Sequence, residues 1–293
     1  METTICQIVD SSGNLPRDFV NQYNISEVPF YFKFEDTDYY CGNDDYSISD
    51  FYKHMKKYPY NIPKTSAPNI NDWLETFEKQ YSKGFKKFIV TTISTKLSSS
   101  FQTAISAKNI FIKGKNDIHM EVISSNTCAC GQAALEIMIA KMIDTNKNFA
   151  DIIKTIHKFV KNVNTLFAVN SLTYMKAGGR IGGATAFLGK LINIKPICEF
   201  VDGAVLPIKA VRGRKKSLKA MVDVATSRII DINKLIIIIQ SAEYHDDMDY
   251  IINYLREKTN YIGQIFKGDL GISVGAHSGP GAIGIGFVEN PLV

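Results

Sequence analysis

Four short segments of the sequence bring hydroxyl, carboxylate or imidazole side chains together with turn-forming residues. These segments are Asp10–Ser12, Lys64–Pro68, Ser94–Ser100 and His277–Ala282. Hydroxyl groups and free backbone amides can donate hydrogen bonds to an anion, and an imidazole can donate, accept or carry a proton. The residue types therefore point to recognition of an anionic group. Helix capping and ordinary turns are the structural alternatives for each segment.

His277 stands among small residues, which allow the backbone to approach a ligand closely. A histidine with a purely structural role is the alternative. No second histidine or carboxylate lies at metal-ligand spacing, so we expect no metal site. The sequence also lacks a G-x-S-x-G motif and a convincing Ser/His/Asp set, which argues against a serine hydrolase.

Two segments in the second half of the chain could contact phosphate or an acidic partner. The glycine-rich segment Lys176–Gly183 contains Arg180, but it matches neither the GxGxxG nor the GxxxxGK[ST] pattern. A structural turn is the alternative there. Lys209–Lys216 has five basic residues in eight positions, which indicates either a solvated face or a surface for an acidic partner.

The first half of the chain alternates apolar runs of strand length with stretches of helical period. Ile5–Val9, Phe88–Ile93 and Met120–Ser124 are predicted strands, and the apolar positions between them predict crossover helices. Strand and helix in alternation are typical of an α/β layer with a mostly parallel sheet. In such sheets the carboxyl ends of the strands form the site, where Asp10 and Ser94 follow their strands.

The second half continues with strands and helices but is richer in glycine. Fifteen of the 20 glycines lie beyond residue 177, so we place domains at 1–163 and 164–293. A helix is predicted from Cys130 and another over Asp151–Val163. The further predicted strands are Leu166–Asn170, Leu235–Gln240, Ile272–Ala276 and a hairpin over Lys195–Ile208 that turns at Asp202-Gly203, and the further predicted helices are Leu218–Ile230 and Met248–Lys258.

Composition and charge exclude several classes of protein. With 45% hydrophobic and 22% charged residues among 293, the chain is typical of a folded globular protein. The net charge of +5 is too mild to indicate a nucleic-acid binder by itself. We expect the five cysteines to be reduced, with Cys128 and Cys130 as small buried residues. No leader or membrane segment is evident, so a cytoplasmic protein is expected.

At the segments described above the sequence resembles the DegV family of bacterial fatty-acid-binding proteins. The match is carried by Val9–Ser12, Thr65–Pro68, Ile93–Ser98, Met175–Ile181, Leu188–Pro196 and His277–Ala282. The Gly-Gly-Arg-Ile to Ile-Lys-Pro block and the His-x-Gly-Pro-Gly block are specific in combination. Two departures stand out. Ser94-Thr95 and Leu97-Ser98-Ser99-Ser100 replace the usual Ser-Ser and Leu-Ser-Gly-Thr, and Ser278 replaces a threonine.

The resemblance implies an α/β fold of two domains with one long-chain fatty acid buried between them. Thr65, Ser94 and His277 would then bind the carboxylate. The supporting site residues would be Thr95, Arg180, Ser278 and Gly279. No other cofactor is implied. Burying a sixteen-carbon tail could supply roughly 12 kcal/mol before the costs of association, which makes tight lipid retention plausible.

The resemblance also implies a partner. Such proteins present the acyl chain to a separate ATP-dependent fatty acid kinase, so this chain would be a carrier and not the catalyst. Arg212, with Lys209 and Arg214 nearby, would contact that kinase. One alternative is a phosphotransferase in which Gly178–Gly183 holds phosphate and Arg180 or Lys195 neutralises charge. A nucleic-acid-binding regulator that uses Lys209–Lys219 is a weaker alternative, because no aromatic-interleaved surface accompanies the basic run.

Overall fold

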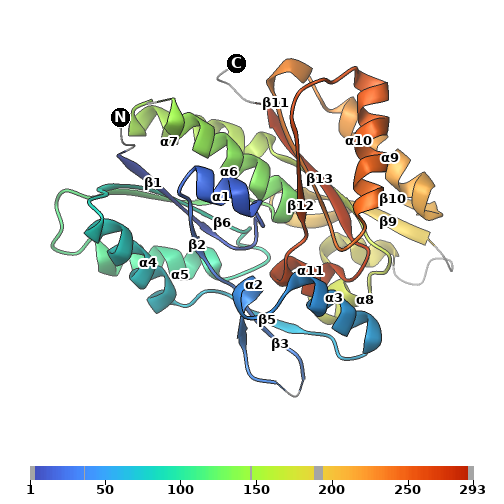
Figure 1. The fold of residues 1–293 in the computed structure, drawn as a ribbon, viewed down its shortest axis with the longest axis horizontal. Helices are drawn as coiled ribbons and strands as arrows, with labels where there is room; N and C mark the ends of the chain where they lie inside the picture. The colour runs from blue at the N-terminus through green and yellow to red at the C-terminus, as the bar shows by residue number, and fades with distance from the viewer. Residues whose placement is uncertain (1–3, 36, 146, 188–193, 290–293) are drawn as a thin grey trace.

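Continuous apolar runs form the strands of the first sheet, which is parallel throughout. The computed structural model describes residues 4–35, 37–145, 147–187 and 194–289 (Figure 1). The strands of the first sheet, in spatial order, are β2 (Ser26–Val28), β1 (Ile5–Asp10), β6 (Lys87–Thr92) and β7 (His119–Ser124). Every residue of β1 is buried, as expected for a strand covered on both faces. The predicted mostly parallel sheet is confirmed.

Helices cover both faces of this sheet (Figure 1). One face packs against α1 (Arg17–Gln22), α6 (Ala129–Asp144) and α7 (Phe149–Phe159). The other face packs against α4 (Ile70–Ser82) and α5 (Ser100–Phe111). The helix α4 presents Trp73 and Phe77 to the sheet, and both rings are fully buried. These helices occupy the stretches in which helical apolar spacing predicts crossovers.

The second sheet is mixed and is formed by six strands from the second half of the chain. In spatial order they are β10 (Ala204–Arg212), β9 (Ile194–Val201), β8 (Asn164–Ala168), β13 (Ile283–Glu289), β11 (Leu235–Ser241) and β12 (Ile265–Asp269). The strands β9 and β10 form the predicted hairpin, whose turn residues Asp202 and Gly203 both have positive φ. The expected α/β class of this half is confirmed.

The helix α6 lies between the two sheets and is buried on all sides. All of its residues except Lys141 and Asp144 are buried. It packs on Ile5 and Val9 of the first sheet and on Ile236 and Val288 of the second. The helices α9 (Arg214–Ser227) and α10 (His245–Thr259) cover the outer face of the second sheet. Every helix in the described ranges is too short or too polar to cross a bilayer.

A small antiparallel sheet extends from the first half toward the second. It consists of β4 (Tyr40–Cys41), β3 (Tyr31–Lys33) and β5 (Lys64–Ser66). The adjoining helices are α2 (Gly42–Asp45), α3 (Ile48–Lys57), α8 (Thr173–Ala177) and α11 (Ile272–Ser278). A single apolar cluster joins Phe32 and Phe51 from this region to Met175 and Ile272 of the second half. The small sheet thereby brings Thr65 next to α11.

One predicted element is wrong, and several observed elements, β13 among them, are absent from the prediction. Ile272–Ala276 forms most of helix α11, whereas the alternating Ile, Val and Ala pattern predicts a strand. The strand β13 lies farther along, in a stretch whose glycines favour a loop. The predicted block Leu188–Asn193 lies outside the described residues. The domain boundary at 163/164 stays a prediction.

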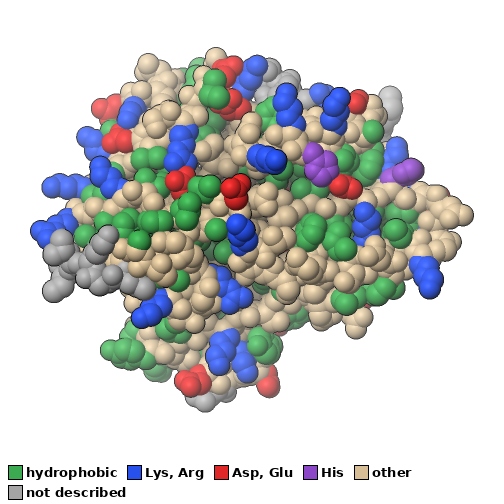
Figure 2. Space-filling view, turned by 180° about the vertical axis from the view of Figure 1, so that it is seen from behind, with side chains coloured by type: hydrophobic (Ala, Val, Ile, Leu, Met, Phe, Trp, Pro, Cys, Tyr) green, Lys and Arg blue, Asp and Glu red, His purple; other side chains and the backbone are tan. Residues whose placement is uncertain are grey.

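Charged side chains are dispersed over the surface. Figure 2 shows Lys and Arg side chains spread across one face and interspersed with acidic side chains. The 34 basic residues exceed the 29 acidic ones by only five. A long single-sign stripe, which is typical of nucleic-acid binders, is not what this face presents.

Candidate functional site

A mostly apolar pocket lies between the two main sheets and is closed on one side by α11. Its volume is about 290 Å³, at the lower end of the range of small-molecule sites. The first half contributes β5, the loop after β6 and the start of α6, and the second half contributes β8, β9, β10 and β13. Its apolar lining includes Phe30, Ile93, Leu97, Cys128, Ala129, Phe167, Met175, Phe200, Val205, Leu270, Val274 and Ile283.

Thr65 and His277 form a hydrogen-bonded pair in the pocket wall. The Oγ1 atom of Thr65 lies 2.8 Å from Nε2 of His277. Thr65 is held in place by β5, which pairs with β3 at Phe32. His277 lies in the last turn of α11. The structure thus brings together two of the three predicted carboxylate ligands, from opposite halves of the chain.

The imidazole of His277 is held neutral by its surroundings. Burial, together with the positive charge of Arg180, lowers its pKa from 6.5 to about 4. On the side of Nδ1 the ring meets Gly178, where a Cβ atom would lie only 2.1 Å from Nδ1. The absence of a side chain at Gly178 therefore makes room for the ring. At neutral pH the imidazole can donate only one hydrogen bond.

The predicted supporting residues fall into two groups. Arg180 and Ser278 line the pocket, and Ser278 is buried. Arg180 donates from Nε to the carbonyl of Leu97 and from Nη1 to the carbonyl of Gly178, so it ties the glycine-rich segment to the loop after β6. Gly279 has a φ of +78°, and the ring of Tyr174 occupies the space of its missing Cβ. Thr95 is exposed and outside the pocket lining.

Ser94 is fully buried and lies outside the pocket lining. Its Oγ donates to the carbonyl of Gly203 at 2.7 Å, in the turn of the β9–β10 hairpin. The same Oγ accepts from the amide of Lys96. Ser94 therefore joins the first half of the chain to the hairpin. Its predicted role as a carboxylate ligand stays a prediction, because that role requires the hydroxyl to leave Gly203.

Several lining residues were not predicted from the sequence. Ser98 and Ser99 line the pocket from the loop that contains Ser94. Their presence in the Ser-rich turn was a signal that could have found them. Cys128 and Cys130 also line the pocket, and burial raises the pKa of the Cys130 thiol to about 12. Both thiols are therefore unreactive apolar lining, in agreement with the interpretation of these residues as small and buried.

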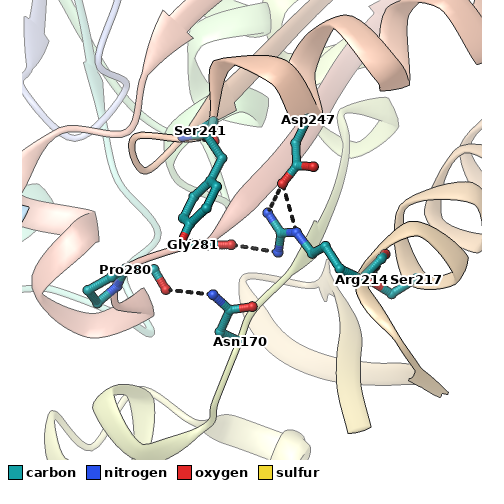
Figure 3. Close-up of polar contacts among 8 residues, drawn as sticks. Asn170, Arg214, Ser217, Ser241, Asp247, Pro280 and Gly281 are labelled. Atoms are coloured by element: carbon teal, nitrogen blue, oxygen red, sulfur yellow. Dashed lines mark hydrogen bonds and ion pairs between the residues drawn. The ribbon is translucent and has the colours of Figure 1, made fainter. Parts of the chain in front are cut away.

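The basic residues at the end of β10 and the start of α9 differ in exposure and in their contacts. Lys209 and Arg212 are exposed. Arg214, by contrast, contacts Asp247 at 2.8 Å and donates to the carbonyl of Gly281 at 2.7 Å (Figure 3). Arg214 thus supports the loop that follows His277, and its predicted partner role stays a prediction. The partner role of Lys209 and Arg212 stays a prediction.

Lys195 and Arg180, the cations that the phosphotransferase alternative would use, also donate hydrogen bonds to backbone carbonyls. Lys195 donates from Nζ to the carbonyl of Asn170 at 3.3 Å. The amide of Asn170 in turn donates to the carbonyl of Pro280, as Figure 3 shows. In the described part of the chain, no three or more His, Cys, Asp or Glu side chains form a group that could hold a metal ion.

The fold is of the α/β class, and its pocket combines an apolar lining with one hydroxyl–imidazole pair. Comparison of the sequence with models of known protein families identifies the family of this chain. The chain belongs to the DegV family, whose model, described as that of an uncharacterised protein family, matches residues 4–290. The resemblance drawn from the sequence motifs is confirmed.

Relatives span the full length of the chain. A DegV domain-containing protein from Clostridium acetobutylicum is 29% identical over 286 residues, which cover 97% of this chain and 99% of that protein. A protein from Thermotoga maritima named fatty acid-binding protein is 26% identical over 284 residues, which cover 96% of each.

Solved structures share the fold. A stearic acid-binding protein from Eubacterium ventriosum superposes with a TM-score of 0.90 at 24% identity and 99% coverage of both chains. DegV from Bacillus subtilis, described as a fatty acid binding protein, superposes with a TM-score of 0.84 at 25% identity. That alignment covers 98% of this chain and 100% of the Bacillus protein.

Proposed function

We propose that this protein binds one long-chain fatty acid in the pocket, with the carboxylate at Thr65 and His277. The observation that carries the proposal is an apolar cavity whose wall contains a hydroxyl–imidazole pair contributed by both halves of the chain. Relatives named as fatty-acid-binding proteins support the choice of ligand. The proposal assigns the rest of the lining to the acyl chain.

The Thr65–His277 pair can supply hydrogen-bond donors to a carboxylate. When the neutral ring carries its proton on Nε2, it donates to Oγ1 of Thr65, which leaves the threonine hydroxyl free to donate to the ligand. A hydrogen bond to a charged group contributes about 1.5–3 kcal/mol. A bound carboxylate also attracts the nearby guanidinium of Arg180 and raises the proton affinity of His277. The site can therefore distinguish an acid from its ester.

The apolar lining can supply most of the affinity. Burial of a methylene group contributes about 0.8 kcal/mol, so a long acyl chain gains several times more than the carboxylate. Association and ordering of the chain offset part of this gain. We therefore expect the pocket to retain its lipid through purification.

The proposal further assigns this protein the role of a carrier that presents the carboxylate to a separate ATP-dependent fatty acid kinase. Support comes from the exposed basic side chains of Lys209 and Arg212 at the end of β10, next to the segment that holds the His277 loop. A guanidinium can engage a carboxylate or a phosphate bidentately, which suits contact with an acidic partner surface. In this proposal the phosphoryl transfer takes place on the partner.

Extraction and mass spectrometry test the binding step. Protein purified from bacteria is analysed intact by native mass spectrometry and then extracted with organic solvent. We expect about one long-chain fatty acid per chain in wild type and a lower occupancy in Thr65→Val. A lipid-free preparation that also fails to take up oleate or palmitate would contradict the proposal. ATP turnover by the purified chain alone with fatty acid would favour the phosphotransferase alternative.

A further inference from the structure

The turn Asp10–Ser12 after β1 is a buried polar segment that the proposed carboxylate site does not use. Asp10 and Ser12 are fully buried behind the pocket, outside its lining. Three consecutive residues of the turn each accept a hydrogen bond from the backbone amide of a pocket-lining residue. The turn therefore contacts the apolar wall at three separate points.

The three contacts reach three different segments of the chain. Asp10 accepts from the amide of Ile93 at 2.9 Å, through its Oδ2 atom. The hydroxyl of Ser11 accepts from the amide of Phe30 at 2.9 Å. The carbonyl of Ser12 accepts from the amide of Ala129 at 3.0 Å. These three lining residues form the wall on the side of the first sheet.

Asp10 holds both ends of the Ser-rich loop that follows β6. Its Oδ2 accepts from the amide of Ile93 where the loop begins and from the hydroxyl of Ser100, at 2.6 Å, where α5 begins. The loop between these points contributes Leu97, Ser98 and Ser99 to the pocket lining. One carboxylate oxygen therefore fixes the span of a segment that shapes the pocket.

The other oxygen of Asp10 connects the turn to α6. Its Oδ1 accepts from Nε2 of Gln132 at 2.9 Å and from the hydroxyl of Ser12. A carboxylate can only accept, so it suits a position surrounded by donors. An asparagine at this position would place an N–H group against donors on one side. The turn would then lose the hydrogen bond from Nε2 of Gln132.

The helix α6 begins with an unusual conformation that the same turn stabilises. Ala129, the first residue of α6, has a φ of +48°, in the left-handed region that L-residues rarely adopt. Its amide donates to Ser12, and Ala129 lies in the pocket wall between Cys128 and Cys130. A strained residue persists where its surroundings fix it. The turn thus also determines where this part of the wall lies.

We propose that Asp10 is a positioning residue that sets the shape of the apolar wall of the pocket, and with it the chain-length preference. The proposal rests on the proposed function, because it assigns the apolar wall to a fatty acid. Asp10 acts through Ile93, Ser100 and α6 and does not touch the ligand. The hydrogen bonds of Asp10 go to Ile93, Ser100, Ser12 and Gln132, and none of them joins it to Thr65 or His277.

The test compares chain-length preference with head-group preference. Wild type, Asp10→Asn and Thr65→Val are titrated with stearate, laurate and the methyl ester of stearate, by displacement of a fluorescent fatty acid. For Asp10→Asn we expect stearate to bind about tenfold more weakly than to wild type. The ratio of stearate affinity to laurate affinity should also fall. The ratio of acid affinity to ester affinity should equal that of wild type. Thr65→Val should show the reverse, a lost acid-to-ester preference with an unchanged chain-length ratio.

A matched variant separates positioning from general destabilisation. Phe77→Leu removes packing volume from the core between α4 and the first sheet, away from the pocket. It should lower the melting temperature and leave both ratios unchanged. If Asp10→Asn keeps the wild-type chain-length ratio, or Phe77→Leu changes that ratio as much, the proposal is overturned.

Two milder variants keep the proposal testable where Asp10→Asn does not fold. Ser100→Ala removes one donor from Oδ2 of Asp10, and Ser11→Ala removes the acceptor of the Phe30 amide. Each should shift the stearate-to-laurate ratio in the same direction by about threefold. Unchanged ratios in both would overturn the proposal. Failure of wild type to bind stearate would instead contradict the proposed function.

Discussion

Thr65 and His277 are separated by 212 residues in the sequence, yet their Oγ1 and Nε2 atoms are 2.8 Å apart. The contact joins β5 of the small sheet to α11 of the second half, so it forms only in the folded protein. Substitution of either Thr65 or His277 should therefore alter the preference of the pocket for a free carboxylate, although the two residues come from different halves of the chain.

Replacement of Thr65 by valine should weaken acid binding. Valine keeps the shape of threonine and removes the hydroxyl, so we expect a loss of about 1–3 kcal/mol in binding free energy for palmitate. Displacement of a fluorescent fatty acid measures it. Thr65→Ser, which retains the hydroxyl, is the control and should stay close to wild type. Equal affinities for all three proteins would exclude Thr65 as a ligand.

A methyl group at Gly178 should displace His277. The Cβ atom of Gly178→Ala would lie 2.1 Å from Nδ1, so the ring has to move away from Thr65. We expect weaker fatty-acid binding in this variant. Gly179→Ala is the matched control: its φ of +71° makes the substitution strained, but its Cβ would contact nothing within 4 Å. That variant should lose stability and bind normally at a temperature at which it is folded.

Stability of the ligand-free protein should depend on His277 between pH 6.5 and about 4. The unfolded chain takes up a proton near pH 6.5, whereas the folded protein resists protonation until about pH 4. The unfolded state therefore binds more protons in this window, and the contribution of His277 to stability is lost as the pH falls through it. Melting temperatures of wild type and His277→Gln should converge toward pH 4. A constant difference between them would contradict the lowered pKa.

Ser94→Ala should act mainly on stability. The hydroxyl of Ser94 joins the loop after β6 to the carbonyl of Gly203, and loss of such a bond costs about 1 kcal/mol. Thermal unfolding should detect a lower melting temperature, while palmitate affinity changes less than in Thr65→Val. If affinity falls as far as in Thr65→Val with stability intact, Ser94 is a carboxylate ligand, as the family resemblance implies.

Arg212→Glu should reduce acyl-phosphate formation in a reconstituted kinase assay and leave fatty-acid binding near normal. The side chain is exposed at the end of β10, so charge reversal should disturb only a partner surface. Lys113→Glu, an equal charge reversal on an exposed residue of the first half, is the control for net charge. Loss of bound lipid with full coupling to the kinase would reverse the roles assigned here.

Buried strands were the most predictable elements. The strands β1, β6 and β11 lie inside the fold, so their sequences are continuous apolar runs that differ from the surrounding loops. The hairpin of the second sheet was predictable because Asp202-Gly203 can adopt positive φ in a tight turn. In both cases the signal is local.

The strand β13 could not be predicted because its pattern depends on a distant element. Gly284 and Gly286 alternate with large apolar residues, and glycine in a strand normally suggests a loop. Here a Cβ at Gly286 would lie 2.0 Å from the carbonyl oxygen of Cys130, at the start of α6. The glycines allow the helix to approach the sheet closely. The helix α11 was also mispredicted, because its seven residues are too few to establish a helical period of apolar positions.

The site was only partly predictable. Spacing alone left Thr65 and His277 as a possible helix cap and a possible structural histidine, and only the resemblance joined them. No sequence pattern indicates that β5, three residues long and mostly exposed, pairs with β3 and faces α11. The engagement of Arg214 with Asp247 was equally hidden, since their ion pair bridges α9 and α10.

The central position of α6 constrains how a ligand can enter or leave. Both sheets pack on this helix, so swinging the two halves apart would expose side chains such as Leu135, Ile137 and Ile139 to water. Each costs about 1.5–3 kcal/mol, and together they approach the total stability of a typical domain, about 5–15 kcal/mol. A hinge through the middle of the molecule is therefore too costly for exchange. For the lipid binding proposed above, exchange would then involve a local part of the pocket lining, where Arg180 ties Gly178 to Leu97 by two hydrogen bonds.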